Sequence, residues 1–279
     1  MTQNFQPVSN ETDCQHEYAD ILGVKVSAIN MSRAVDMANQ WIAMGSYGYV
    51  CVTGVHGVME TQKDPELREI LNHAVMNAPD GMPMSWVGRL QGFDQMDRVF
   101  GPDFMSAMCQ ISPEQSYRHF LYGGQPGVAQ TLKETLERNF PGLQIVGTYT
   151  PPFRALNAEE ETELLSQVHA SSPHILWVGL STPKQERFMA HYVDRLQVPL
   201  LVGVGAAFDY HTGRIQDCSP WIKRAGLQWL HRLLQDPRRL WRRYLSNNPA
   251  FVWKITLQLL KLHRYRVPPI RPLPPHRPM

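Results

Sequence analysis

The sequence predicts an α/β fold, a Rossmann-like parallel sheet with helices on both faces, followed by a basic helical C-terminal appendage. Near-continuous apolar runs alternate with amphipathic runs of helical spacing, which is typical of strands buried on both faces of a parallel sheet. Glycine or proline follows most of the apolar runs. After Gly213 the composition changes to segments rich in Trp, Leu and Arg, which predicts a separate set of helices.

The first part of the chain leads into the sheet. The expected elements are a strand and turn (18–30), a helix (31–45), a strand (47–55), a helix (64–74) and a short strand (75–81). We expect Ser32 near the N-cap of the first helix, because its hydroxyl can accept a backbone hydrogen bond there. Pro65 suits the first turn of the second helix. The short strand ends at Pro79-Asp80-Gly81.

The middle of the chain repeats this alternation more regularly. The expected elements are strand 117–124, helix 125–142, strand 143–150, helix 157–172, strand 173–181, helix 182–196 and strand 198–208. Ligands of such sheets bind at the carboxyl ends of the strands. The residues expected along that edge are Thr53, Asp80, Gly123, Gly124, residues 181–185 and Gly205.

Length and composition indicate one large core with attachments. We expect an arm (1–19), an α/β core (20–213), a basic helical appendage (214–266) and a Pro-rich tail (267–279). With 279 residues, 43% of them hydrophobic, the chain can bury a sizeable core. It has no run of eighteen apolar residues and no apolar N-terminal leader, so neither a spanning helix nor a secretory signal is expected. The 4 cysteines are scattered, which predicts reduced thiols and no zinc site.

The charge is distributed unevenly. Residues 214–279 hold 14 Lys and Arg against 2 Asp, whereas the rest of the chain holds 13 basic and 23 acidic residues. This split predicts an anionic partner for the appendage: a membrane surface, nucleic acid or phosphate. Arginines interleaved with Trp suit a membrane interface, although a solvated basic helical pair with Trp in its core would look similar. The tryptophans are Trp221, Trp229, Trp241 and Trp253.

Three motifs admit both a structural and a binding interpretation. "LYGGQPGVA", with Gly123 and Gly124, could hold a phosphate at a helix N-terminus, but it lacks the Lys-Ser/Thr of a P-loop. "VGVGAAF" contains Gly205 but has Phe208 in place of the third glycine of a dinucleotide fingerprint. Tight turns also need glycine without any ligand. In "STPKQERFM", Lys184 lies at a positive helix end, which is unfavourable unless an anion or polar ligand binds there.

A carboxylate and an arginine are further candidates. In "NAPDGMPMSW", Asp80 is either a turn residue or a strand-end carboxylate that accepts a proton from an attacking hydroxyl. In "DRVFGPDF", Arg98 is either an ion-paired loop residue or a group that returns to the same edge as Asp80. Since the chain has no D-x-D motif, we expect no metal site of the aspartate-pair kind.

Six ordered blocks resemble the WecG/TagA/CpsF glycosyltransferases. They are "VTGVHGVMETQKDPELREILNHAVMNAPDG", "RVFGPDFM", "FLYGGQPGVA", "PHILWVGLSTPKQERFM", "VGVGAAFDYHTG" and "GLQWLHRLLQDPRRLWRRY". Together they extend from about residue 20 to 245, and their order is more specific than any single motif.

The resemblance implies an inverting, metal-independent transfer of a hexose from a UDP-sugar to a polyprenyl-diphosphate-linked sugar. The protein would lie peripherally at the cytoplasmic face of the bacterial inner membrane, on anionic lipid. No cofactor and no nucleic acid are expected, and a homo-oligomer is left open. The "VTGVHGVME" variant is most like the branch that makes xanthan-type polymers, so UDP-glucose is the first choice of donor. UDP-ManNAc and its uronate are the alternatives.

The resemblance also implies residue roles. Asp80 matches the general base, and the other catalytic positions are Thr53, Arg98 and Gln185. Val55 stands where the family has Asn, so the neighbouring His56 is a candidate substitute. The residues expected to bind substrate are His56, Gly123, Gly124, Lys184, Gly205, Asp209, Arg232, Arg238, Arg239 and Arg242. The appendage arginines, with Arg243, would stabilise the departing diphosphate.

Two other classes of function stay open on the residues alone. "VGVGAAF" favours a nicotinamide-dependent oxidoreductase, but the third glycine and a well-placed acidic residue after it are missing. A basic adaptor could bind nucleic acid through residues 214–266, although the acidic α/β body argues against it.

Overall fold

A computed structural model describes residues 17–265 and 267. Most of the expected arm and of the Pro-rich tail, with Cys14, lies outside the described residues. A six-stranded sheet in the order β4-β3-β8-β7-β5-β6 forms the centre, and every pairing in it is parallel. The strands are β3 (Gly48–Thr53), β4 (Met76–Pro79), β5 (Arg118–Gly123), β6 (Gln144–Tyr149), β7 (Ile175–Gly179) and β8 (Leu200–Gly203).

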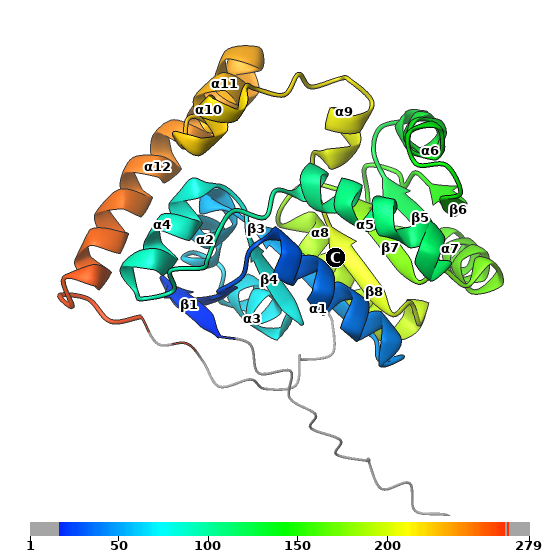
Figure 1. Ribbon diagram of the computed structural model, residues 1–279, viewed down its shortest axis with the longest axis horizontal. Helices are drawn as coiled ribbons and strands as arrows, with labels where there is room; N and C mark the ends of the chain where they lie inside the picture. The colour runs from blue at the N-terminus through cyan, green and yellow to red at the C-terminus, as the bar shows by residue number, and fades with distance from the viewer. Residues whose placement is uncertain (1–16, 266, 268–279) are drawn as a thin grey trace, which may run out of the picture.

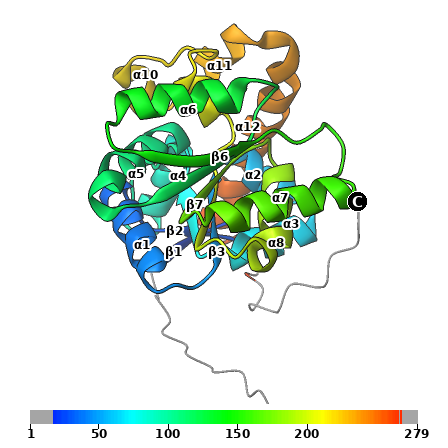
Figure 2. The ribbon, with the colours of Figure 1, turned by 90° about the vertical axis from the view of Figure 1, so that its right-hand side faces the viewer.

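Helices cover both faces of the sheet (Figures 1 and 2). One layer contains α1 (Met31–Ala43), α5 (Gly101–Gln115), α6 (Val128–Asn139) and α9 (Ala207–His211). The other contains α2 (Val55–Thr61), α3 (Pro65–His73), α7 (Ala158–Ser171) and α8 (Lys184–Leu196). The expected fold class is therefore confirmed.

The strands explain why the apolar runs are continuous. Along β7, Leu176 and Val178 belong to one buried cluster, whereas Ile175 and Trp177 belong to the other. Successive side chains of a strand point to opposite faces. A strand with a packed core on each face therefore needs apolar residues at every position.

Local signals set most helix starts. Asp64 caps α3 and Pro65 occupies its first turn, as expected. The N-cap of α1 is Asn30, whose side chain accepts from the backbone N–H of Arg33, so the expectation of Ser32 was wrong. Asn30 precedes the first helical residue, where its amide oxygen reaches the free backbone donors, whereas Ser32 is already inside the helix.

Among the helices that were not expected, α9 starts inside the expected strand 198–208, and two others begin shortly after a strand. Helix α2 has only seven residues, and Gly54 at its N-cap offers no capping side chain. Helix α4 (Met82–Leu90) carries Pro83 and Gly88. A Cβ at Gly88 would lie 2.0 Å from the sulfur of Met96, so any other residue there would force the Met96 side chain to move. Beside α4 lies the antiparallel hairpin of β1 (Tyr18–Ile21) and β2 (Val24–Ser27).

The appendage consists of three helices that return to the carboxyl edge of the sheet. They are α10 (Pro220–Arg224), α11 (Gln228–Gln235) and α12 (Pro237–Leu259). In Figure 1, α10 and α11 stand apart from the sheet and α12 descends past α2 and α4. Helix α12 packs on α2 and runs through Pro249 without ending. No helix within the described residues is long and apolar enough to span a bilayer.

Candidate active site

A cavity of about 1680 Å³ lies between the carboxyl edge of the sheet and the appendage. Sites for one small molecule usually occupy roughly 300–1,000 Å³, so this cavity has room for two substrates. Its walls include the last residues of β3 and β7, residues that directly follow β4 and β8, helix α4 and residues from all three appendage helices. The edge predicted from the alternation of strands and helices is therefore the edge that opens into the cavity.

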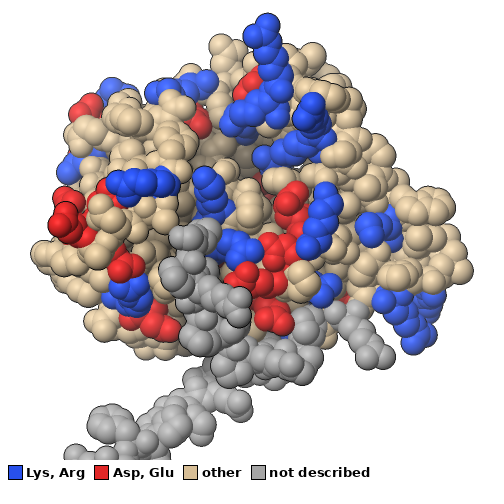
Figure 3. Space-filling model, turned by 180° about the vertical axis from the view of Figure 1, so that it is seen from behind, with Lys and Arg blue, Asp and Glu red and all other residues tan. Residues whose placement is uncertain are grey.

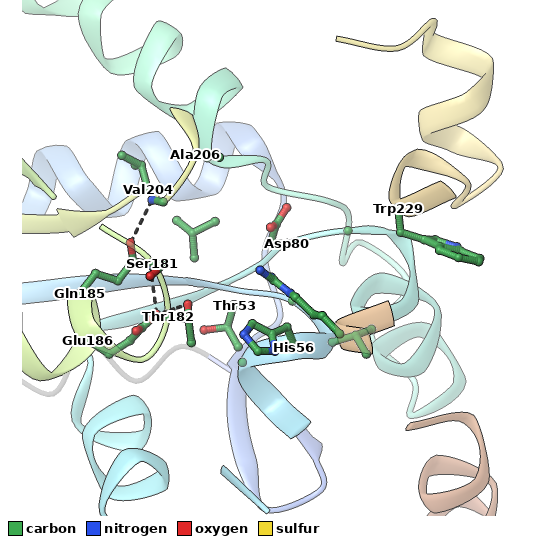
Figure 4. Close-up of a pocket in the computed structure, with 18 of the residues that line it drawn as sticks. Thr53, His56, Asp80, Ser181, Thr182, Gln185, Glu186, Val204, Ala206 and Trp229 are labelled. Atoms are coloured by element: carbon green, nitrogen blue, oxygen red, sulfur yellow. Dashed lines mark hydrogen bonds between the residues drawn. The ribbon is translucent and has the colours of Figure 1, made fainter. Parts of the chain in front are cut away.

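Asp80 is placed by the backbone. Its N–H donates to the carbonyl oxygen of Thr53 at 2.9 Å, which extends the pairing of β3 and β4 by one step. A Cβ at Gly54 would lie 2.9 Å from the carbonyl oxygen of Asp80, so only glycine permits this approach. Gly81, at φ +88°, then turns the chain into α4. Asp80-Gly81 is thus a turn, and this turn also holds the carboxylate of Asp80 in the wall of the cavity (Figure 4).

Burial and three cations act on this carboxylate in opposite directions. Burial raises the pKa of Asp80 above its usual value, while the guanidiniums of Arg98, Arg243 and Arg232 lower it. Burial has the larger effect, so the net shift is upward. A carboxylate with a raised pKa is a stronger base than an exposed aspartate when it is ionised.

Arg98 connects the core to the appendage. One of its terminal nitrogens donates to Oε1 of Gln228 in α11 at 2.5 Å, and its guanidinium lies 4.2 Å from the centre of the Phe100 ring. Asp97 pairs with Arg89 and accepts the backbone N–H of Arg98, so Asp97 does not neutralise the Arg98 side chain. The interpretation of Arg98 as an ion-paired loop residue is not supported within the described residues.

Gln185, in the first turn of α8, is hydrogen-bonded to the turn after β8. Its Oε1 accepts from the backbone N–H of Gly205 at 3.0 Å, and its Nε2 donates to Glu186 at 3.1 Å. Glu186 also accepts from the hydroxyl of Thr182 and is only 2% exposed, and this burial raises its pKa. The hydroxyl of Thr53 is buried without a partner among the described residues. The sequence reasoning missed Glu186, although it follows Gln185 directly.

His56 is held by a residue that the sequence reasoning also missed. Nδ2 of Asn247 in α12 donates to Nδ1 of His56 at 3.1 Å. Glu60 lies 3.6 Å from the same nitrogen. However, burial, with Arg243 and Lys63, lowers the pKa of His56 to about 4, so the ring is neutral near pH 7 and forms no ion pair. In Figure 4, His56 lies with Thr53 and Asp80, and Gln185 and Glu186 lie on the other side of the site.

The appendage arginines divide into two groups. Arg232, Arg239 and Arg243 line the cavity, and Arg232 also contacts the hydroxyl of Tyr210 at 3.4 Å. Arg238 and Arg242, both expected to bind substrate, do not line it. They are four residues apart and therefore share a different face of α12. Composition alone could not show which arginines face the site.

Of the remaining residues expected to bind substrate, all but one line the cavity. Lys184, Gly205, Asp209 and Gly124 line the cavity. Gly123 does not, and a Cβ there would lie 2.6 Å from the carbonyl oxygen of Gly179, so its role is close packing of β5 on β7.

The turn after β8 does not have the form expected for a dinucleotide site. The Gln185 side chain accepts the Gly205 N–H that a phosphate would need, and Phe208 packs against Gly179. Among the described residues, no three His, Cys, Asp or Glu side chains gather as metal ligands would.

Most of this chain is similar in sequence to known proteins. Residues 19–265 match the Glycosyl transferase WecG/TagA/CpsF family. A protein of Bacillus spizizenii is 30% identical over 187 residues, which is 67% of this chain and 70% of that protein. A protein of Bacillus subtilis is 26% identical over 184 residues, 66% of this chain and 70% of that protein. Both are named N-acetylglucosaminyldiphosphoundecaprenol N-acetyl-beta-D-mannosaminyltransferase.

Proposed function

Because the chain belongs to the WecG/TagA/CpsF family of glycosyltransferases, we propose that it moves a hexose from a UDP-sugar to a sugar linked through diphosphate to a polyprenyl lipid. One observation carries the proposal. Asp80 lies at a strand end in a cavity that also receives Arg98 from the core and Arg232 and Arg243 from the appendage. This arrangement combines a base with cations for a leaving diphosphate.

The proposed reaction is a single displacement with inversion. The acceptor hydroxyl gives its proton to the carboxylate of Asp80 while its oxygen forms a bond to the anomeric carbon of the donor. The bond from that carbon to the diphosphate oxygen breaks on the opposite side, and its electron pair leaves with UDP. Asp80 ends the step protonated and returns the proton to solvent.

The leaving diphosphate needs positive charge close by. Arg98, Arg232 and Arg243 supply it in the proposal, and backbone N–H groups at the strand ends add donors. Removing one such preorganised donor typically costs about 10²–10³ in kcat. These cations belong to the protein itself, which fits the metal-independent chemistry implied by the family resemblance.

Two donors compete. The "VTGVHGVME" segment supports UDP-glucose, whereas the names of the Bacillus relatives support UDP-ManNAc. The test is to supply each donor, with a synthetic lipid-diphosphate-sugar acceptor carrying glucose or N-acetylglucosamine, and to measure UDP release and product mass. Transfer from one donor identifies the substrate pair. No transfer from any UDP-sugar, with no stabilisation by UDP, would contradict the proposed function.

The appendage is also the proposed contact with the membrane. Trp221, Trp241 and Trp253 are exposed on it. In Figure 3, the appendage end of the molecule carries Lys and Arg side chains with few acidic ones among them. Aromatic rings and cations suit the headgroup region of an anionic bilayer. We place the protein peripherally at the cytoplasmic face, where UDP-sugars are made.

A further inference from the structure

The cavity has an apolar wall on α4 that the proposed chemistry does not use. Met82, Trp86 and Leu90 are four residues apart, so they share one face of α4, and all three line the cavity. Trp86 is 42% exposed and Leu90 is 71% exposed. Large apolar side chains left open along a cavity mark a surface that a ligand covers.

Helix α12 forms a second wall whose character changes along its length. Arg239 and Arg243, in its first two turns, line the cavity, and Arg243 also lowers the pKa of Asp80. Farther along, Leu245 and Val252 line it and are 58% and 63% exposed. They are seven residues apart, so they share one flank of the helix. The lining therefore passes from cationic to apolar along the helix.

The far ends of the two walls meet. The side chain of Gln91, just after α4, donates to the carbonyl oxygen of Asp20 at 2.7 Å, and Gln258 of α12 donates to the same oxygen at 2.9 Å. Near its middle, α4 touches the turn before α11, because a Cβ at Gly226 would lie 2.5 Å from the Trp86 ring. Both helices thus run from the reaction centre towards β1, and we call the space between them the α4–α12 groove.

The charges and the apolar surface together indicate the ligand. An anionic group fits beside Arg232 and Arg243, and a hydrocarbon fits the continuing walls, which is the pattern of a lipid diphosphate. A UDP-sugar has no hydrocarbon to cover Leu90 or Val252. Helix α4 has nine residues, so the groove is about 13 Å long. Only the part of the chain nearest the diphosphate would lie in it.

We propose that the α4–α12 groove binds the first isoprenoid units of the lipid-linked acceptor. The enzyme would then recognise the hydrocarbon directly, in addition to the sugar and the diphosphate. This inference rests on the proposed function, because it assigns a place to the lipid of that acceptor.

The test compares two acceptors that differ only in their lipid, in detergent and without bilayers. One carries a single isoprene unit, and the other carries a chain long enough to span about 13 Å. For the wild type we expect kcat/KM to favour the long chain by about tenfold or more, as for other apolar pockets. Leu90→Asp should abolish most of this preference, because a charge in the groove opposes the hydrocarbon. Val252→Asp, on the other wall, should also abolish most of the preference for the long chain. It tests the proposal independently if Leu90→Asp does not fold.

The matched control is Leu234→Asp. Leu234 is as exposed as Leu90, at 74%, but does not line the cavity, so this variant should keep the wild-type preference. Equal use of both acceptors by the wild type would overturn the proposal. So would an equal loss of preference in the Leu90 and Leu234 variants, which would indicate a general surface effect.

A binding measurement separates this proposal from the proposed function. Calorimetric titration with prenyl diphosphates of the two chain lengths, without any sugar, should show tighter binding of the long chain to the wild type than to Leu90→Asp. If no acceptor is glycosylated but this difference in binding remains, the proposed function is wrong and the proposal of an isoprenoid-binding groove is supported. If glycosylation occurs without this difference in binding, only the proposal of an isoprenoid-binding groove is wrong.

Discussion

Asp80→Asn removes the basic lone pair of Asp80 and leaves its support in place. The bond to Thr53 and the turn at Gly81 belong to the backbone. Loss of general-base help should lower kcat by about two to four powers of ten, or roughly 3–5 kcal/mol of activation free energy. Stopped or continuous UDP-release assays at saturating acceptor measure this loss. UDP affinity should stay near that of the wild type, because Arg98 and the appendage arginines are unchanged.

Stability distinguishes this loss from misfolding. Burial raises the pKa of Asp80 in the folded state, so its ionised form destabilises the fold above the pKa of the unfolded chain. The neutral Asn lacks this penalty, and its Tm at pH 7 should equal or exceed that of the wild type. Asp103→Asn is the matched control, since Asp103 also influences Asp80 but does not line the cavity. An Asp80→Asn enzyme within about threefold of the wild-type kcat would refute the assignment.

Three further predictions follow from the same site. Activity should rise with pH as Asp80 loses its proton, and the pKa of Asp80 is raised. The apparent pKa of the acid limb of kcat/KM should therefore lie above the value of about 3.9 for a free aspartate, and an apparent pKa below that value would contradict this. Asn247→Asp should raise the pKa of His56 from about 4, because a carboxylate favours the charged ring; histidine NMR titration checks it, and an unchanged pKa would show that the contact is absent in solution. Arg232→Ala should lower kcat by about 10²–10³, whereas Arg242→Ala should leave kcat unchanged, because Arg242 does not line the cavity. Sedimentation with anionic liposomes should show the same small loss of membrane binding for both variants, about 1 kcal/mol per cation.

The fold and the core half of the site could be predicted because both follow from strand alternation. In a parallel sheet all carboxyl ends meet at one edge, so Thr53, Asp80 and Gln185 had to lie near one another once the strands were recognised. Helices α2 and α4 escaped prediction because they are short and carry glycine or proline at the positions where a helix signal is read.

The appendage half of the site depends on contacts that no local pattern encodes. Gln228 meets Arg98 across 130 positions, and Asn247 meets His56 across 191. Which arginines of α12 face the cavity depends on the rotation of the helix about its axis. Its contact with α2 and its buried residues, such as Phe251 and Ile255, set that rotation. The sequence predicted helices rich in Trp, Leu and Arg after Gly213, but not the surface that they cover.

The division of the site between two parts of the chain has a chemical consequence. In the proposed mechanism the core supplies the base, Asp80, while the appendage supplies Arg232 and Arg243 for the leaving group, and all three residues line the cavity. Several hydrogen bonds join the parts at the cavity itself, among them those from Arg98 to Gln228 and from Asn247 to His56. The site is therefore complete only when the appendage is packed on α2. The appendage also carries three exposed tryptophans, Trp221, Trp241 and Trp253. The proposed membrane surface would therefore, by orienting the appendage, complete the proposed site where the lipid-linked acceptor is found.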